Sequence, residues 1–250
     1  MAVSRAAAMG VSAKDADRLR QFFGERYQLI EKDPVFRNAP SALPYCYSSE
    51  RPSEGMALVY APKTLGRDTP VIVFLHGYGG SLLWSQQLLA EAFPNYLTIC
   101  PAYGINSTSI PSTYVLECLQ AVQKKMGRTI RPPVLMGLSE GGFGAARIFT
   151  QSPGQFSRLI VVAAYPPEET LIHFNKKMSA RFLVGAKEDS VQSGLFGRYM
   201  QSIRPRIGDL EFQTIPDGDD FFLLTRKEQT LKVLRSWLTT PAVLNPAVKK

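Results

Sequence analysis

The sequence is poor in histidine, because only His76 and His173 occur among its 250 residues. Histidine is the side chain whose ordinary pKa lies nearest to neutral pH, and it is the most frequent general base in enzymes. A mechanism that needs a histidine base must therefore use one of these two residues or do without one.

Cysteine is also scarce, and long apolar runs are missing. The three cysteines, Cys46, Cys100 and Cys118, form no CxxC pair and no metal-binding spacing, which favours buried, reduced thiols. No apolar run approaches the roughly 18 residues of a membrane-spanning helix, and residues 1–8 lack the apolar stretch of a signal peptide. We expect no membrane span and no intact signal peptide, which leaves the compartment open with a slight preference for the cytoplasm.

The charge is basic, since 29 Lys and Arg residues against 21 Asp and Glu residues give a net charge of +8. The excess lies in the last third of the chain, around a short acidic segment at residues 210–224. The basic residues are scattered along the expected helices without an aromatic platform among them, so a solvated surface is favoured over nucleic acid binding. A chain of this length and ordinary composition can bury one large core.

Apolar segments alternate with amphipathic segments from residue 70 onward. Strands are expected at 56–60, 71–75, 96–100, 133–136, 159–164, 181–184 and 210–215, and helices at 13–32, 113–126, 140–151, 191–203 and 225–238. Continuous apolar runs separated by helices are typical of a parallel sheet covered on both faces. The ligand site of such a sheet lies at the carboxyl ends of its strands.

The segment that indicates chemistry is Gly137–Gly141, which reads G-x-S-x-G between the expected strand 133–136 and the expected helix 140–151. In a nucleophile elbow, this tight turn presents the serine hydroxyl above the sheet, at a helix N-terminus that favours developing negative charge. A turn that only reverses the chain would use similar residues. The strand–turn–helix context nevertheless makes Ser139 the candidate nucleophile.

A second glycine-rich segment, His76–Gly80, directly follows the expected strand 71–75. Glycines at this point let backbone N–H groups face a substrate oxyanion. A phosphate-binding loop is the alternative, but neither G-x-G-x-x-G nor a P-loop lysine is present. We expect His76 to support the loop and not to transfer protons.

With both segments in view, residues 43–240 resemble the α/β-hydrolase superfamily, and Gly137–Ala145 is similar to the elbow of its esterase D-type and dienelactone-hydrolase-type members. The resemblance implies an α/β-hydrolase fold, with a mostly parallel sheet of about eight strands and helices on both faces. Many family members carry a lid between the strands expected here at 159–164 and 181–184, but the segment 165–180 is short enough for only one helix, so we expect no large lid. It also implies three regions: an N-terminal helix and extended segment at 1–42 packed on the core, the hydrolase domain at 43–240 and a tail at 241–250.

The resemblance further implies roles for individual residues in the hydrolysis of a small-molecule carboxylic ester. Ser139 would form the acyl-enzyme, and the backbone N–H groups of Tyr78 and Glu140 would form the oxyanion hole. Asp189, after the next-to-last strand, would be the acid, with Glu188 as the less favoured neighbour; Asp189 would also suit the N-cap of the next helix. Neither a cofactor nor a metal is implied, and no oligomeric state follows.

The resemblance fails at the base. The family carries a histidine after the last strand, and Ile215–Leu224 matches that segment except that Asp220 occupies the histidine position. The ordinary pKa of Asp is about 3.9 against about 6.5 for His, so Asp220 is a poor acceptor for the serine proton. A carboxylate that faces Asp189 would instead share a proton with it. His173 belongs to a crossover helix that runs away from the catalytic edge, so we do not expect it to substitute.

Three interpretations remain open: a serine hydrolase inactivated at Asp220, a pseudoenzyme that binds a small ligand or partner in the same cleft, and metal-dependent chemistry at Asp217, Asp219 and Asp220. These acids do not match the D-x-[DN]-x-[DN]-G cation loop, so we expect no metal. We favour the first, an esterase scaffold that is inactive or strongly impaired. Five aromatic residues suit either an acyl pocket or the core: Tyr78, Trp84, Tyr103, Phe143 and Phe221.

Overall fold

The computed structural model describes residues 11–40, 45, 55–78, 82–104 and 110–240. Its centre is a sheet of seven described strands: β1 (Ala57–Tyr60), β2 (Val71–Leu75), β3 (Leu97–Pro101), β4 (Val134–Leu138), β5 (Arg158–Val162), β6 (Ser179–Gly185) and β7 (Asp209–Ile215). The strand order is β1-β3-β2-β4-β5-β6-β7. Strand β1 is antiparallel to β3, and every other pairing is parallel. The predicted mostly parallel α/β architecture is therefore confirmed.

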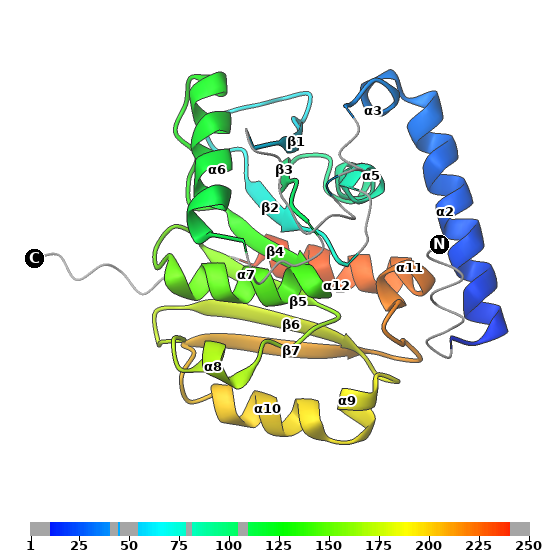
Figure 1. Ribbon diagram of the computed structural model, residues 1–250, viewed down its shortest axis with the longest axis vertical. Helices are drawn as coiled ribbons and strands as arrows, with labels where there is room; N and C mark the ends of the chain where they lie inside the picture. Colours follow the sequence, from blue (N-terminus) through cyan, green and yellow to red (C-terminus); the bar gives the residue numbers. More distant parts are fainter. Residues whose placement is uncertain (1–10, 41–44, 46–54, 79–81, 105–109, 241–250) are drawn as a thin grey trace, which may run out of the picture.

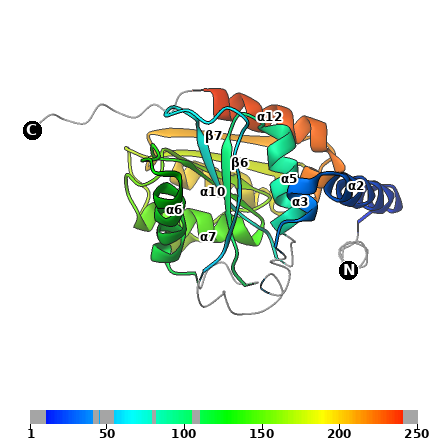
Figure 2. The ribbon, with the colours of Figure 1, turned by 90° about the horizontal axis from the view of Figure 1, so that it is seen from above.

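Helices cover both faces of this sheet (Figures 1 and 2). They are α2 (Ala13–Lys32), α3 (Pro34–Arg37), α5 (Leu82–Ala92), α6 (Ser112–Met126), α7 (Glu140–Gln151), α8 (Glu168–Leu171), α9 (Asp189–Gln192), α10 (Leu195–Ile203), α11 (Phe222–Thr225) and α12 (Lys227–Thr239). Helices α6, α7 and α10 bury apolar side chains against one face, while α2, α5 and α12 contribute to the core on the other.

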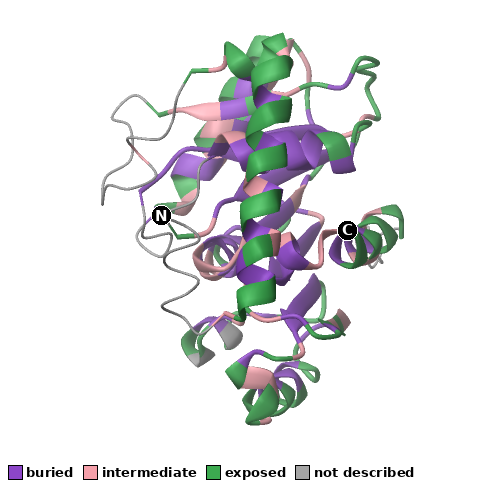
Figure 3. Ribbon diagram, turned by 90° about the vertical axis from the view of Figure 1, so that its right-hand side faces the viewer, coloured by how far each residue is buried: buried purple, intermediate pink, exposed green. Residues whose placement is uncertain are grey.

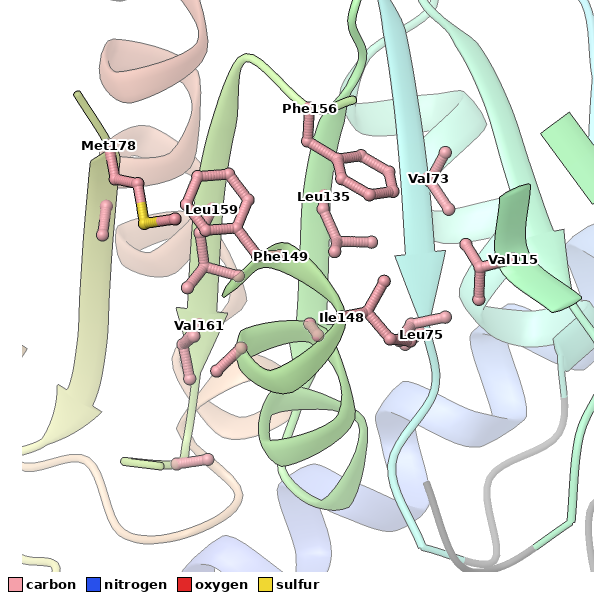
Figure 4. Packing of buried hydrophobic residues seen from close by; sticks show 14 of the residues in the cluster. Val73, Leu75, Val115, Leu135, Ile148, Phe149, Phe156, Leu159, Val161 and Met178 are labelled. Atoms are coloured by element: carbon pink, nitrogen blue, oxygen red, sulfur yellow. The ribbon is translucent and has the colours of Figure 1, made fainter. Parts of the chain in front are cut away.

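The two cores follow from the pleat of the strands, which sends successive side chains to opposite faces. In β2, Val73 and Leu75 belong to the first core and Phe74 belongs to the second. Figure 4 shows Ile148 and Phe149 of α7 among the strand side chains of the first core. Both faces of the central strands are therefore apolar, which explains their continuous hydrophobic sequence.

Helix α2 forms an outer layer, because its main contacts are with the helices α3, α5 and α11. Its buried residues include Leu19, Phe22, Arg26 and Ile30, which recur every three or four positions and so share one face. Figure 3 shows the opposite face of α2 exposed along most of its length. None of the helices in the described part of the chain has the length and apolar character needed to cross a membrane.

The structure differs from the sequence-based expectation in three helices. Helix α5 was not expected, because nine of its eleven residues are buried and its sequence therefore lacks the polar face that makes a helix recognisable. The expected helix 191–203 is two helices, α9 and α10, separated at Gly194, whose φ is 72°. The short helix α11 was not expected, and it precedes α12, which matches the expected helix 225–238 except for its first two residues.

Cys46 and the tail 241–250 lie outside the described residues. The sheet contains seven described strands where about eight were expected. The linker between β5 and β6 carries the four-residue helix α8, in keeping with the expectation of no large lid.

Candidate functional site

The junction of β4 and α7 holds Ser139 in a strained backbone conformation. Its φ is 49° and its ψ is −120°, a region that residues with a side chain rarely adopt. The Ser139 N–H donates to the Val162 carbonyl at 2.8 Å, and the Ser139 carbonyl accepts from the Gly142 N–H at 2.7 Å. These bonds fix the serine at the carboxyl end of β4, next to the end of β5.

Glycines are required around this turn because backbone segments meet there without room for a side chain. A Cβ on Gly137 would lie 2.2 Å from the Gly141 carbonyl oxygen, and a Cβ on Gly141 would lie 2.3 Å from the Leu75 carbonyl oxygen. The first two turns of α7 are therefore pressed against both β4 and the end of β2.

The loop after β2 runs beside the strained turn. A Cβ on Gly77 would lie 3.4 Å from the Cβ of Ser139 and 3.2 Å from the Leu138 carbonyl oxygen. Tyr78, the next residue, is 49% exposed, and Glu140 is the first residue of α7. The loop and the helix N-terminus thus flank Ser139 on two sides, while residues 79 and 80 of the predicted glycine segment lie outside the described residues.

His76 is buried beneath this loop, where it is 1% exposed. Its Nδ1 lies 2.8 Å from the Gly77 carbonyl oxygen and its Nε2 lies 3.2 Å from the Tyr103 carbonyl oxygen. The ring stacks on Tyr103 with centroids 4.0 Å apart, and the Tyr103 hydroxyl donates to the His76 carbonyl. Burial lowers the pKa of His76, so the ring is a neutral support for the loop, as the sequence predicted.

His173 lies in the exposed turn after α8. The chain is then close to the start of β6, at the amino-terminal edge of the sheet, where the Lys176 carbonyl oxygen would be 2.0 Å from a Cβ on Gly208. Ser139 stands at the opposite, carboxyl edge of the sheet. The expectation that His173 belongs to a crossover helix is wrong, because α8 ends at Leu171, and its distance from the edge that holds Ser139 stays a prediction.

The turn after β6 places two adjacent acids differently. Asp189 is exposed and is the first residue of α9, so Glu188 and not Asp189 occupies the N-cap position of that helix. Glu188 is 7% exposed, and its Oε1 accepts a hydrogen bond of 2.6 Å from the Gly185 N–H. The preference for Asp189 as the acid stays a prediction, and burial together with the hydrogen bond from Gly185 makes Glu188 a candidate beside it.

Glu188 faces the acids of the turn after β7. Its pKa is raised to about 7, mainly by burial and then by the charges of Asp220 and Asp219, while the hydrogen bond from Gly185 opposes the rise. Asp220 reaches solvent at the surface, yet partial burial and then the charges of Asp219 and Asp189 raise its pKa as well. Like charges are therefore crowded at this edge, which disfavours full ionisation of the group.

Asp219 has a local structural role, because its Oδ1 accepts a hydrogen bond of 2.9 Å from the Phe221 N–H. Within the described ranges, no three His, Cys, Asp or Glu side chains are grouped so that they could hold a metal ion.

Backbone hydrogen bonds join the turn after β6 to the turn after β7. The Lys187 N–H donates to the Gly218 carbonyl at 2.7 Å, and the Ala186 N–H donates to the Ile215 carbonyl at 3.0 Å. The Lys187 ammonium also pairs with the Asp217 carboxylate at 3.2 Å. Because β4, β5, β6 and β7 are adjacent and parallel, these turns and Ser139 share the carboxyl edge of the sheet.

The aromatic candidates divide between core and surface. Trp84 is buried and packs edge-on against Phe22 and Phe23 at 5.8 Å, and Tyr103 is buried under the loop after β2. The remaining three reach the surface: Tyr78, Phe143 and Phe221. Two hollows of about 610 and 430 Å³ lie beside β1 and share Ala57, Val59 and Val122 in their walls, which do not include Ser139.

Comparison with known proteins gives matches in structure only. No protein-family model matches the chain, and no curated protein matches it in sequence. The apo form of Thermogutta terrifontis esterase 2 is similar with a TM-score of 0.58 and 12% identity, over 73% of this chain and 88% of that chain. A predicted CIB-like hydrolase from Thermoplasma acidophilum is similar with a TM-score of 0.55 and 17% identity, over 74% and 97% of the two chains.

A third similar structure is Est1E from Butyrivibrio proteoclasticus, with a TM-score of 0.53 and 12% identity, over 73% of this chain and 93% of that chain. Another is described as an alpha/beta hydrolase enzyme from a deep-sea metagenome library, with a TM-score of 0.55 and 13% identity. Identities this low establish the fold alone. Together with the strand order and the helices on both faces, they show that this chain has the α/β-hydrolase fold.

Proposed function

We propose that this chain is a carboxylic-ester hydrolase scaffold that forms an acyl-enzyme on Ser139, and that it is inactive or strongly impaired because Asp220 stands at the base position. One observation carries the proposal: Ser139 has a φ of 49° at the β4–α7 junction, while the two histidines of the chain are engaged or exposed elsewhere. The elbow sequence Gly137–Ala145 supports a relationship to esterase D-type and dienelactone-hydrolase-type enzymes.

In this proposal, the substrate carbonyl sits between Ser139 and an oxyanion hole made by the backbone N–H groups of Tyr78 and Glu140. The close approach of Gly77 to Ser139 supports this arrangement, because it brings the loop to the serine. The N-terminal end of α7 adds a partial positive charge where the oxyanion develops. Donors of this kind typically contribute about 3 kcal/mol each to the transition state.

The acid would come from the turn after β6, where Glu188 and Asp189 are the candidates. Burial, the hydrogen bond from Gly185 and the electrostatic coupling to Asp220 favour Glu188. Asp189 is exposed but also acts on the pKa of Asp220, so it remains the second candidate.

Asp220 makes a poor base for two physical reasons. The ordinary pKa of an aspartate carboxyl lies well below that of histidine, although partial burial and then the charges of Asp219 and Asp189 raise the pKa of Asp220. In addition, a carboxylate cannot carry positive charge after it accepts a proton. Loss of the histidine from a serine triad costs on the order of 10⁶ in kcat, or about 8 kcal/mol. A residual acceleration of ~10³ over water from the oxyanion hole is compatible with such a site.

The decisive variant is Asp220→His, assayed with a short p-nitrophenyl ester. We expect hydrolysis to rise by several orders of magnitude, because the imidazole can take the Ser139 proton and return it to the leaving group. Asp220→Asn is the matched control, and it should hydrolyse the ester at the wild-type rate. The double variant Asp220→His, Ser139→Ala should show no increase in hydrolysis. A folded Asp220→His variant with no gain would contradict the proposal.

The Asp220→His variant can also show whether Glu188 or Asp189 is the acid. Adding Glu188→Gln to Asp220→His should reduce kcat about 100-fold, whereas adding Asp189→Asn should reduce it less than threefold. The reverse order would assign the role to Asp189.

The alternative function is that of a pseudoenzyme that binds a small ligand or partner in the same cleft. The position of Asp220 favours it, because a carboxylate there prevents the ordinary proton transfer while leaving Ser139 and its loop in place. In that case, Ser139→Ala would leave ligand affinity unchanged, and Asp220→His would create no esterase.

A further inference from the structure

The N-terminal helix is joined to the base-position turn by a buried ion pair. Asp15 lies in the first turn of α2, and its Oδ1 is 2.7 Å from Nη1 of Arg226, which directly precedes α12. The two side chains are only 11% and 13% exposed, and 211 positions separate them in sequence. Removing two charged side chains from solvent is costly unless they are well paired. We therefore expect this ion pair to have a specific role.

Asp15 is built to hold this arginine. It is a first-turn acid whose N–H donates to Oγ of Ser12, the N-cap, at 3.2 Å, and its carboxylate accepts from the Ser12 hydroxyl at 3.0 Å. Arg18 adds a second cation at 2.8 Å from Oδ1. The hydrogen bond from Arg226, followed by these neighbours, holds the pKa of Asp15 well below its usual range despite burial. The carboxylate is therefore charged and fixed in orientation.

Arg226 carries the connection onward to the turn after β7. While Nη1 contacts Asp15, Nη2 donates to the Asp217 carbonyl at 2.9 Å. Asp217 has a φ of 56°, an unfavourable conformation that persists only where the surroundings impose it. Asp220 follows three residues later and leads into α11, which also packs against α2 (Figure 1). The helix, the arginine and the strained turn form one continuous path to Asp220.

We propose that Asp15, acting through Arg226, is a positioning residue that fixes the turn Asp217–Asp220 at the carboxyl edge of the sheet. Helix α2 is then a working part of the site and not only an outer cover of the core. This inference rests on the proposed function, because it gives the residue at position 220 a fixed place relative to Ser139. A planar guanidinium suits this role, since its separate N–H groups contact a carboxylate and a carbonyl at the same time.

The activity test uses the Asp220→His background. Adding Asp15→Asn should lower kcat about 10- to 100-fold with KM within twofold, because a displacement of about 1 Å at a catalytic group has an effect of this size. The apparent pKa values read from the dependence of kcat on pH should change as well. Asp17→Asn is the matched control: Asp17 is on the same helix and pairs with Arg20, but both side chains are mostly exposed, so its kcat should stay within twofold.

A second measurement uses the protein without the histidine substitution, so it does not depend on the proposed function. In Asp15→Asn, amide hydrogen exchange should speed up about tenfold at Lys187 and Gly218, whose N–H groups bond within the joined turns. The Asp209 N–H, bonded to Met178 at the other edge, should exchange at its original rate. Arg226→Lys, which keeps the charge but cannot bridge both partners, should give the same pattern even if Asp15→Asn folds poorly.

The outcomes distinguish the two ideas. Unchanged kcat and unchanged exchange at Lys187 and Gly218 would overturn the positioning role while Asp220→His still restored hydrolysis. No hydrolysis by folded Asp220→His would overturn the proposed function, and faster exchange at the two amides would still support the connection through Arg226.

Discussion

Charged side chains are arranged differently at the two edges of the sheet. At the amino edge, Arg181 is 3% exposed and pairs with Asp209 at 2.8 Å and with Glu211 at 3.4 Å. Arg158, 2% exposed, donates to Ser179, which donates in turn to Asp209. Cations and anions are thus matched there.

At the carboxyl edge, charges of one sign face one another and the backbone is strained. Burial and neighbouring acids raise the pKa values of Glu188 and Asp220. The described residues other than glycine that have a positive φ are Ser139, Ala163 and Asp217, which follow β4, β5 and β7. The carboxyl edge therefore holds strain and crowded charge, both of which lower stability, whereas the amino edge holds matched ion pairs.

The largest effect is expected from breaking the amino edge. Arg181→Met keeps much of the side-chain volume but leaves Asp209 and Glu211 without their main cation. We expect the free energy of unfolding to fall by about 3 kcal/mol, mainly because Asp209, whose side chain is 20% exposed, loses its closest cation. Glu211 is 42% exposed and should contribute little. Lys187→Met is the counterpart at the carboxyl edge. Its pair with Asp217 is mostly exposed, so we expect a change below about 1 kcal/mol.

Urea denaturation measures both variants. A loss in Lys187→Met that equals the loss in Arg181→Met would remove the contrast between the two edges.

The sequence predicted the apolar strands well, but it does not distinguish between the two adjacent acids of the candidate site or show contacts between distant parts of the chain. Strand β2 coincides with its prediction because its five consecutive residues are all buried, and a strand buried on both faces has a continuous apolar sequence. The choice between Glu188 and Asp189 depends on the turn that returns to Gly185, and two adjacent acids look alike in a sequence. The Asp15–Arg226 pair joins the two ends of the chain, and no local pattern indicates a contact of that range.

A smaller effect is expected from relieving the crowded charge. The pKa of Glu188 is raised to about 7 in the folded protein, so the folded state holds a proton that the unfolded state releases at lower pH. Stability is therefore lost as pH rises from about 4.5 to 7. Glu188→Gln keeps an acceptor for Gly185 without the charge. It should be about as stable as wild type at pH 4.5 and about 2 kcal/mol more stable at pH 8.

Thermal and urea unfolding across this pH range give the comparison, with Glu228→Gln as a control because Glu228 is exposed. A gain that does not grow with pH would show that Glu188 carries no electrostatic penalty.

The smallest effect concerns the backbone strain at Ser139. Glycine adopts a φ of 49° without the steric cost that a Cβ imposes. Glycine also gives the unfolded chain more conformational freedom, which opposes this gain. The net effect of Ser139→Gly should be an increase of about 1 kcal/mol in the free energy of unfolding. Ser139→Ala retains the Cβ and the strain, and it removes the same hydroxyl, so it is the matched control and should leave stability near wild type. The difference in the free energy of unfolding between the two variants isolates the strain. Equal stabilities would mean that the carboxyl edge stores no strain at the serine, and the contrast between the edges would then rest on charge alone.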